Sequence, residues 1–422
     1  MGKSVDLLYG KSQIKLELPE GKPIQMLEST PYAPAGSPEA ILRDALAQPI
    51  GSPGLAALTQ TARKILLITN DNTRPMPSRL TIPAIIGSFF HPEAFYDITI
   101  LIATGLHRPM SPEEMREQFG DDICAKYKLV NHVAQDQDSL TSFGPMSTGN
   151  ELRLNKLVAE SDLVIAEGFI EPHFFAGFSG GRKSILPGIA GASTILANHK
   201  PEHIAHPGAR QSNLADNPIH TECVEAARLS GLRFILNVAL DKDKRIIAAF
   251  AGDPEKAHEE GCRFVENAMS VDAVQTEIVI TTNNGYPLDR NLYQVVKGID
   301  TASTIAKDGG VIIALARCVD HVGHTGFRDL ILSCSSVGEL REKMTISPSE
   351  VDKWQAQVLA KALSKCRVIL VSEGIERALA ERMFFSYAQS ADEALAMALT
   401  MAGKDAAISV LPEGPVIIPR IT

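Results

Sequence analysis

Short aliphatic runs alternate with amphipathic stretches along most of the chain. Runs of strand length occupy residues 64–69, 98–103, 163–166 and 234–240, and a second series occupies residues 278–282, 311–316, 367–371 and 407–411. Segments with the apolar spacing of helices lie between them, at residues 80–90, 111–118, 221–229, 254–269, 292–306, 348–363, 376–382 and 392–401. This alternation predicts an α/β fold with mostly parallel sheets and right-handed crossovers.

The pattern resets near residues 270–276, where one series of strands and helices ends and the next begins. A chain of 422 residues is long enough for two hydrophobic cores. We therefore predict two Rossmann-like domains, residues 1–270 and 271–422, with an active-site cleft between them. Residues 1–21 alternate like a β-hairpin at the start of the first domain.

Composition narrows the class of protein. Hydrophobic residues make up 45% and charged residues 22%, as in globular proteins, and the formal charge of −9 disfavours binding to nucleic acid. The sequence shows no signal-peptide pattern and no apolar run of membrane-spanning length, and its six cysteines are scattered without a CxxC pair. We expect a cytoplasmic protein with reduced thiols and no membrane partner.

Polar loops follow three of the predicted strands in the first series. They are DNTRPMPS from residue 71, TGLHRPM from residue 104 and the longer GFIEPHFFAGFSGGRKSILPGIAG from residue 168. Taken singly, each loop could be an ordinary surface connection with solvated side chains. Because the carboxyl ends of parallel strands meet at one edge of a sheet, their succession after three strands favours one shared ligand site.

The three loops offer acid–base and anion-binding groups. His107 and His173 follow different strands, and two opposed imidazoles suit a racemase, which needs a base on each face of one carbon. Arg74 can make a two-pronged contact with a phosphate or a carboxylate. Lys183, beside Arg182 in a glycine-rich turn, can grip a phosphate or act as a nucleophile that bonds a cofactor covalently.

Three further segments are candidates for the same cleft. In NHKPEHIAH, Pro201 starts any helix after His199, so we expect at most one of the three histidines to bind a metal such as zinc or nickel. Gln294 and Lys297 share one helix face after a predicted strand and could reach an anionic substrate across the cleft. The loop RCVDHVGHTGF, from residue 317, is a weaker candidate that a plain loop explains equally well.

Several of these motifs together resemble a known family. In the same order, DNTRPMPS, TGLHRP, the EPHFFAGFSGGRK loop, NH at 198–199, NPIH at 217–220, LNV at 236–238 and NNGYPLDRNLYQVVKG at 283–298 resemble the nickel-pincer lactate racemase family of 2-hydroxy acid racemases and epimerases. The match extends from the first strand–helix unit to the helix with the only tryptophan, Trp354. The EPHxxxGxSGGRK loop is highly specific.

The resemblance implies a cofactor and roles for four residues. In that family a pyridinium-3,5-bisthiocarboxylate mononucleotide is attached to the motif lysine, here Lys183, and its Ni(II) is also bound by a histidine, here His199. His107 and His173 match the alternating acid and base. One takes the hydroxyl proton of a 2-hydroxy acid while hydride passes to the cofactor; hydride return to the other face of the 2-keto acid inverts the centre.

The resemblance also implies where the cofactor and the substrate are held. The residues that match the family's cofactor contacts are Asp71, Asn72, Thr73, Arg74, Gln294 and Lys297. Arg74 and Lys297 also match a clamp for the substrate carboxylate. Residues 1–270 would then form the cofactor- and nickel-binding catalytic domain, residues 271–422 would close the cleft, and cofactor-maturation proteins would be partners.

One residue departs from the family pattern. Arg290 stands where the lactate members carry a neutral glutamine, beside the helix of Gln294 and Lys297. An extra cation there predicts a larger or more polar acid than lactate, such as malate or an aldonic acid. The residues alone leave two other functions open: a metal-free enzyme that acts on a small phosphate ester through Lys183, and a two-domain anion-binding protein.

Overall fold

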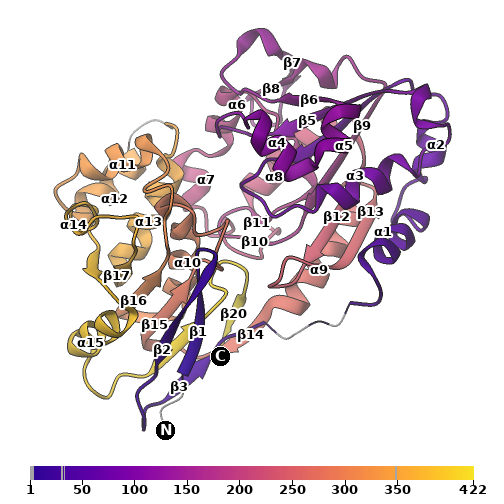
Figure 1. Cartoon of the computed structure of the whole chain (residues 1–422). Helices are drawn as coiled ribbons and strands as arrows, with labels where there is room; N and C mark the ends of the chain where they lie inside the picture. The colour runs from indigo at the N-terminus through magenta and orange to yellow at the C-terminus, as the bar shows by residue number, and fades with distance from the viewer. Residues whose placement is uncertain (1–3, 30–31, 33, 347–348) are drawn as a thin grey trace.

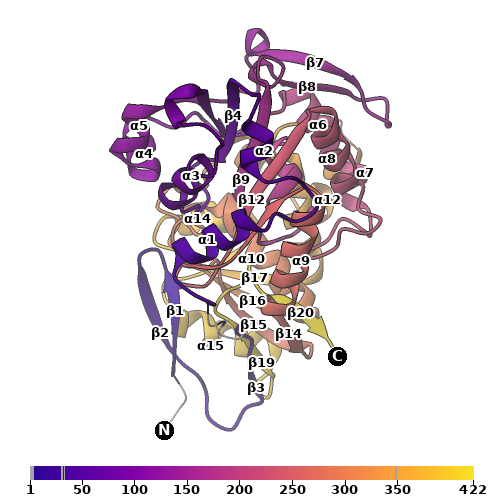
Figure 2. The same cartoon turned by 90° about the vertical axis from the view of Figure 1, so that its right-hand side faces the viewer.

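The computed structural model describes residues 4–29, 32, 34–346 and 349–422. Two six-stranded sheets dominate it, one built mainly from each half of the chain, and helices pack against them (Figures 1 and 2). The α/β class and the mostly parallel sheets predicted from the sequence are confirmed.

The first sheet carries the predicted strands of the first series. Its members are β4 (Lys64–Asn70), β5 (Asp97–Ala103), β6 (Lys128–Asn131), β9 (Leu163–Phe169), β12 (Leu232–Leu240) and β13 (Ile246–Gly252). They lie in the order β13-β12-β9-β4-β5-β6, and only β13 is antiparallel to its neighbour. The strand order reverses at β4, and ligands bind outside the carboxyl ends of strands at such a point.

The second sheet is parallel throughout. Its members are β3 (Ile24–Met26), β15 (Thr276–Thr282), β16 (Ala306–Leu315), β17 (Arg367–Val371), β18 (Ser386–Ala388) and β19 (Ile408–Leu411). They lie in the order β18-β17-β16-β15-β19-β3, so this sheet reverses its order at β15. The same rule makes the carboxyl end of β15 the expected place for a ligand at this sheet.

Helices connect most of the strands. They are α1 (Pro38–Ala47), α2 (Leu55–Thr59), α3 (Ser78–Ile86), α4 (Pro112–Phe119), α5 (Asp121–Lys126), α6 (Ala192–Asn198), α7 (Pro201–Ala205), α8 (Pro218–Leu229), α9 (Lys256–Met269), α10 (Leu292–Ile305), α11 (Thr325–Leu332), α12 (Val337–Ile346), α13 (Lys353–Lys365), α14 (Arg377–Arg382) and α15 (Ala391–Ala402). The helix predicted over residues 348–363 begins at Lys353, and residue 348 lies outside the described residues. Within the described ranges, no helix is long and apolar enough to cross a membrane.

The N-terminal hairpin packs on the second sheet. Strands β1 (Ser4–Tyr9) and β2 (Ser12–Glu17) pair as predicted from residue 4 onward. Their buried face, with Leu7 and Leu16, packs against Ile280, and the next strand, β3, joins the edge of the same sheet (Figure 1). The predicted first domain, residues 1–270, includes this segment, whose apolar face the structure instead places on the second sheet.

Shorter strand pairs complete the fold. They are β7 (Leu140–Pro145) with β8 (Glu151–Asn155), β10 (Pro172–His173) with β11 (Gly177–Phe178), and β14 (Ser270–Ala273) with β20 (Ile418–Ile421). The first two pairs are antiparallel, and β14 is parallel to β20. The β10–β11 turn belongs to the loop that follows β9.

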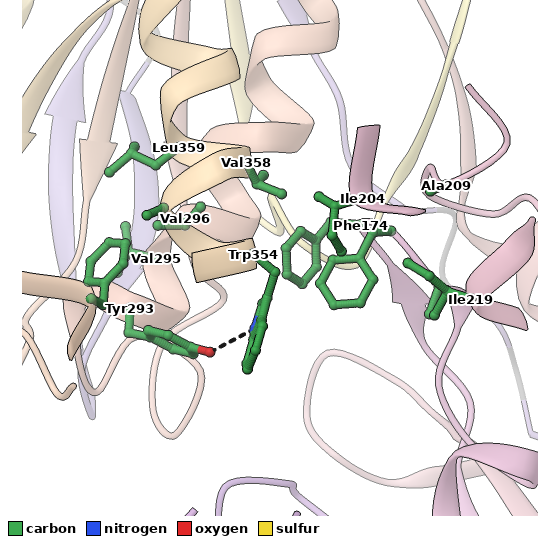
Figure 3. Close-up of a cluster of buried hydrophobic side chains, with 14 of the residues drawn as sticks. Phe174, Ile204, Ala209, Ile219, Tyr293, Val295, Val296, Trp354, Val358 and Leu359 are labelled. Carbon is green, nitrogen blue, oxygen red and sulfur yellow. Dashed lines mark hydrogen bonds between the residues drawn. The ribbon is translucent and has the colours of Figure 1, made fainter. Parts of the chain in front are cut away.

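Apolar side chains join the two halves of the molecule. Trp354 and Val358 of α13 lie beside Phe174 and Ile204 from the first half, all within one buried cluster (Figure 3). The Gln357 side chain also donates a hydrogen bond across the junction, to the carbonyl of residue 201 at 3.0 Å. This packing fixes α13 against the loop that follows β9.

Candidate active site

A cavity lies between loops that follow strands of both sheets. Every residue predicted for the site except Asn72 lines it, namely Asp71, Thr73, Arg74, His107, His173, Lys183, His199, Gln294 and Lys297. The Asn72 side chain is instead hydrogen-bonded to Glu114, in the first turn of α4. The loops that follow β4, β5 and β9 therefore converge on one cavity, as the sequence predicted.

His107 and Asp71 form a hydrogen-bonded pair in the cavity wall. The Nδ1 atom of His107 lies 2.6 Å from Asp71 Oδ2, and the Thr73 hydroxyl and backbone N–H donate to Asp71 Oδ1 at 2.5 and 3.1 Å. Burial opposes ionisation, but His107 and these hydrogen bonds outweigh it and lower the pKa of Asp71. An ionised Asp71 holds the His107 proton on Nδ1, which leaves Nε2 as a proton acceptor.

A buried carboxyl group ties down the loop that carries Asp71. Glu167 on β9 is fully buried, and the hydroxyls of Thr69 and Ser78 donate to its Oε1 at 2.5 and 2.6 Å. The Thr81 hydroxyl donates to its Oε2. Burial raises the pKa of Glu167. Because Thr69 precedes residues 70–77 and the other two hydroxyls follow them, Glu167 joins the two ends of this loop.

Glycines let the loop after β9 approach its neighbours closely. Gly180 has φ +78°, and a Cβ there would lie 2.7 Å from the Asn237 side-chain oxygen. The same oxygen accepts the backbone N–H of Gly181 at 2.8 Å. A residue with a side chain would push this turn away from β12, so glycine is required for its position.

Arg182 does not line the cavity, although it is next to Lys183 in the sequence. Its guanidinium is buried on the other side of the loop, where it donates to the Ala176 carbonyl and lies near His258 Nε2, both at 2.8 Å. Residues 181–184 form a tight 3-10 turn, in which adjacent side chains point in different directions. Arg182 therefore braces the loop and leaves Lys183 facing the cavity.

Lys183 and His173 face each other in the cavity. Lys183 Nζ lies 3.5 Å from His173 Nε2, and His173 Nδ1 accepts the backbone N–H of Ala176 at 3.3 Å. Burial, followed by the charges of Lys183 and Lys297, lowers the pKa of His173 well below its usual value. The neutral imidazole then carries its proton on Nε2, toward the cavity.

The amine of Lys183 is suited to nucleophilic chemistry. Burial is the largest cause that lowers its pKa, to about 7, and the charges of Arg182 and Arg74 act in the same direction. A lysine with this pKa is partly neutral near neutral pH, and only the neutral amine attacks an electrophile. Lys183 can therefore form a covalent bond with a ligand in the cavity.

His199 offers a neutral imidazole to the cavity. It ends α6, and its ring packs edge-to-face between Phe175 and Trp354, with 5.1 Å between centroids on each side. Burial lowers the pKa of His199 to about 3, and its buried Nδ1 has no partner among the described residues. The other two histidines of this segment, His203 and His206, do not line the cavity.

Two residues on the first turns of α10 face the cavity from the second half. Asn291 caps this helix by accepting the Gln294 N–H at 3.0 Å. The Gln294 side-chain oxygen is buried without a partner among the described residues. Burial, and then the charge of Arg74, lowers the pKa of Lys297 to about 7. A lysine whose pKa is lowered by neighbouring cations in one cavity favours an anionic ligand there.

Arg290 does not line this cavity, so its predicted influence on the substrate has no support in the geometry. Its Nε donates to Asp320 Oδ2 at 2.6 Å, and its carbonyl accepts the Asp320 N–H at 2.7 Å. The guanidinium charge is therefore paired within the second half of the chain. It adds no cation to the site.

Several lining residues had little or no signal in the sequence, among them His324, Asp352 and Trp354. His324 follows β16, so the rule that polar loops after strands converge could have ranked it higher. Asp352 and Trp354 lie just before and within α13, where nothing local marks them as parts of a site. Tyr293 also lines the cavity and belongs to the segment of Gln294 and Lys297 that was predicted to face it.

In the described part of the chain, no group of three or more histidine, cysteine, aspartate and glutamate side chains is placed to hold a metal ion. The cavity instead combines Lys183, whose pKa is lowered, with His107 and His173, whose hydrogen bonds select their tautomers. Such a combination is typical of an enzyme active site.

Comparison with known proteins gives the family. Residues 9–212 match the lactate racemase N-terminal domain and residues 271–418 match the lactate racemase C-terminal domain. A lactate racemase from Thermoanaerobacterium thermosaccharolyticum is 41% identical over 422 residues, which cover 99% of each chain. One from Lactiplantibacillus plantarum is 40% identical over 418 residues, 97% of this chain and 98% of that protein. This chain belongs to the lactate racemase family.

Solved structures agree with this assignment. The structure of the lactate racemase apoprotein from Thermoanaerobacterium thermosaccharolyticum superposes with a TM-score of 0.92 at 40% identity and covers 99% of this chain and 100% of that one. A crystal structure of a Thermotoga maritima protein has a TM-score of 0.68 at 18% identity, with 93% of this chain and 100% of that one covered. The second likeness shows the fold alone.

Proposed function

We propose that this protein racemises lactate, or a 2-hydroxy acid of similar size, with a nickel-pincer nucleotide attached to Lys183. The observation that carries the proposal is the arrangement of His107 and His173, which follow different strands and line one cavity with Lys183. Two lactate racemases that are 41% and 40% identical over nearly the whole chain support the same activity.

The residues present fit such a cofactor. Lys183 supplies a partly neutral amine for covalent attachment, and His199 supplies a neutral imidazole with a free ring nitrogen for nickel. Gln294, whose side-chain oxygen has no partner among the described residues, and Arg74 are available to the nucleotide portion. When bound, the nickel-pincer nucleotide supplies an acceptor for the substrate hydrogen as hydride.

The two histidines are preset for opposite proton transfers. His107 presents an unprotonated Nε2 to the cavity, whereas His173 presents Nε2–H. One can accept the substrate hydroxyl proton while the other hydrogen-bonds to the oxygen on the other face. Apart from burial, Lys183 and Lys297 lower the pKa of His173, so attachment at Lys183 and a carboxylate beside Lys297 would ease its protonation and let the roles alternate.

The substrate carboxylate is the anion that Arg74 and Lys297 would bind. Both line the cavity, and Arg74 contributes to the low pKa of Lys297. Because Arg290 is paired with Asp320 outside the cavity, the reason to expect malate or an aldonic acid is lost. We therefore favour lactate itself as the substrate.

The test is to produce the protein together with cofactor-maturation proteins, which we propose as its partners. We expect an adduct on the peptide that contains Lys183, bound nickel, and interconversion of D- and L-lactate. Lys183→Arg should lack the adduct, whereas His107→Ala and His173→Ala should keep adduct and nickel but lose turnover. An unmodified lysine without nickel, while a known lactate racemase matured in parallel carries both, would refute the proposal.

A further inference from the structure

A second histidine–aspartate pair lies in the cavity wall, in the second half of the chain. His324 Nδ1 lies 2.9 Å from Asp352 Oδ1. The His324 ring stacks on Tyr293 with 3.9 Å between centroids and 9° between planes, and its centroid is 6.1 Å from that of His107. Tyr293, His324 and Asp352 come from the second half of the chain and His107 from the first. All four side chains line the cavity.

Asp352 pairs with His324 and does not cap the helix that follows it. It occupies the N-cap position of α13, where an aspartate usually accepts a backbone N–H of the first turn. Its side chain makes no such bond, and its backbone has φ +70°, in the left-handed region that is costly for a residue with a side chain. The buried carboxylate instead accepts His324 Nδ1–H and the Tyr293 hydroxyl.

Contacts continue from this pair to the only tryptophan. The Trp354 indole N–H donates to the Tyr293 hydroxyl at 3.0 Å (Figure 3). The centroid of the Trp354 ring is 5.1 Å from that of the His199 ring. A connected set of side chains therefore runs from His324 through Asp352 and Tyr293 to the wall beside His199.

The loop that carries His324 is fastened to the start of α10. The backbone N–H groups of Leu292 and Tyr293 donate to the carbonyls of His321 and Val322 at 3.0 and 3.1 Å. A Cβ at Gly323 would lie 2.5 Å from the Asn291 side chain, so a glycine is needed for this close packing. Backbone hydrogen bonds and the ring stack therefore both hold His324 beside Tyr293.

We propose that His324 and Asp352 are positioning residues that hold Tyr293 and Trp354 in the cavity wall. Their effect on turnover rests on the proposed racemase function, whereas their effect on Trp354 does not. The strained, uncapped backbone of Asp352 is explained by this role, because structure that serves a site commonly departs from the locally most stable arrangement.

Three variants separate the parts of the pair. His324→Phe keeps a ring to stack on Tyr293 but removes the donor to Asp352. His324→Asn keeps a side-chain N–H near the place of Nδ1 and removes the rest of the ring. His321→Ala is the matched control, because His321 lies on the same loop but does not line the cavity, and the variant removes its side-chain hydrogen bond to the Gly374 carbonyl, at 2.8 Å, and leaves its backbone bonds in place.

Fluorescence and steady-state kinetics give independent readouts. Trp354 is the only tryptophan, so the emission of the cofactor-free protein reports on its surroundings alone. We expect His324→Phe to shift this emission and, in matured enzyme, to lower kcat about 10- to 100-fold with a smaller change in KM. His324→Asn should recover most of both values, and His321→Ala should match the wild type.

Two results would overturn the proposal. One is a His324→Phe variant with wild-type emission and kcat; the other is a His324→Asn variant as impaired as His324→Phe, which would mean that the hydrogen bond to Asp352 is irrelevant. Asp352→Asn, which keeps the side-chain size, should change emission and kcat as His324→Phe does and serves if that variant does not fold. A matured wild type without lactate racemisation would refute the proposed function. The emission shifts would still show whether His324 and Asp352 hold Trp354 in place.

Discussion

Replacing Asp71 by asparagine should nearly abolish turnover without loss of cofactor. The carboxylate accepts the His107 Nδ1 proton at 2.6 Å and so keeps Nε2 free to take a proton. An asparagine can turn its NH2 group to Nδ1, which would favour the tautomer with the proton on Nε2. In that tautomer His107 no longer acts as a base toward the cavity.

The size of the effect follows from the contacts of Asp71. It is 3% exposed, so water does not replace the lost interaction. In the tautomer of His107 that can act as a base, the lost hydrogen bond to a charged group costs about 1.5–3 kcal/mol, and the Nδ1–H left unpaired beside the asparagine NH2 group costs about 1–3 kcal/mol more. If both penalties apply in the transition state, kcat should fall by about 10²- to 10⁴-fold.

The assay is the rate at which one lactate enantiomer converts to the other, followed by chiral chromatography, with nickel and the Lys183 adduct measured in the same sample. Thr73→Val is the control, because it removes the hydroxyl donor to Asp71 but keeps the backbone N–H and the carboxylate. We expect its kcat to fall less than tenfold. An Asp71→Asn enzyme that keeps a third of wild-type kcat would refute the assigned role of the pair.

Three further predictions concern charge and burial. The folded-state pKa values of Lys183 and Lys297 are about 7, below their usual 10.5, so the unfolded chain binds more protons between about pH 7 and 10.5. The cofactor-free protein should therefore gain stability as the pH rises through that range. Lys297→Met should flatten the rise in denaturation midpoint between pH 7 and 9, and an unchanged slope would contradict this prediction. Glu167→Gln should lower the free energy of unfolding in urea by about 1–3 kcal/mol, because it loses an acceptor for buried hydroxyls. A urea midpoint equal to that of the wild type would argue that Glu167 does not hold the two ends of the loop together. Arg290→Gln should leave kcat/KM for lactate within about threefold, because Arg290 pairs with Asp320 outside the cavity, and a wild-type preference for malate would contradict this.

Much of the site was predictable because parallel strands obey a simple rule. Aliphatic runs mark β4, β5 and β9, and the carboxyl ends of parallel strands share one sheet edge. The loops that carry Asp71, His107 and Lys183 therefore had to converge, whatever the details of packing. The capping box of Ser111 and Glu114 was likewise readable, since it depends only on residues three apart.

Other features depend on contacts between distant segments. Arg182 and Lys183 are adjacent cations, yet the turn at residues 181–184 directs one into the protein and the other into the cavity. His324 and Asp352 are separated by 27 residues and meet only because α13 packs beside α10. The N-terminal hairpin also covers the second sheet, although its own sequence matches either sheet equally well.

The sequence by itself determined the strands, the helices and the order of the polar loops, because hydrophobic periodicity and capping act over a few residues. Its motifs also determined the family. Only the tertiary structure decided which cations face the ligand, which tautomers the histidines adopt and which carboxylates hold them. Those properties arise from burial and from hydrogen bonds between residues far apart in the chain, such as Arg290 with Asp320 and Glu167 with Thr69.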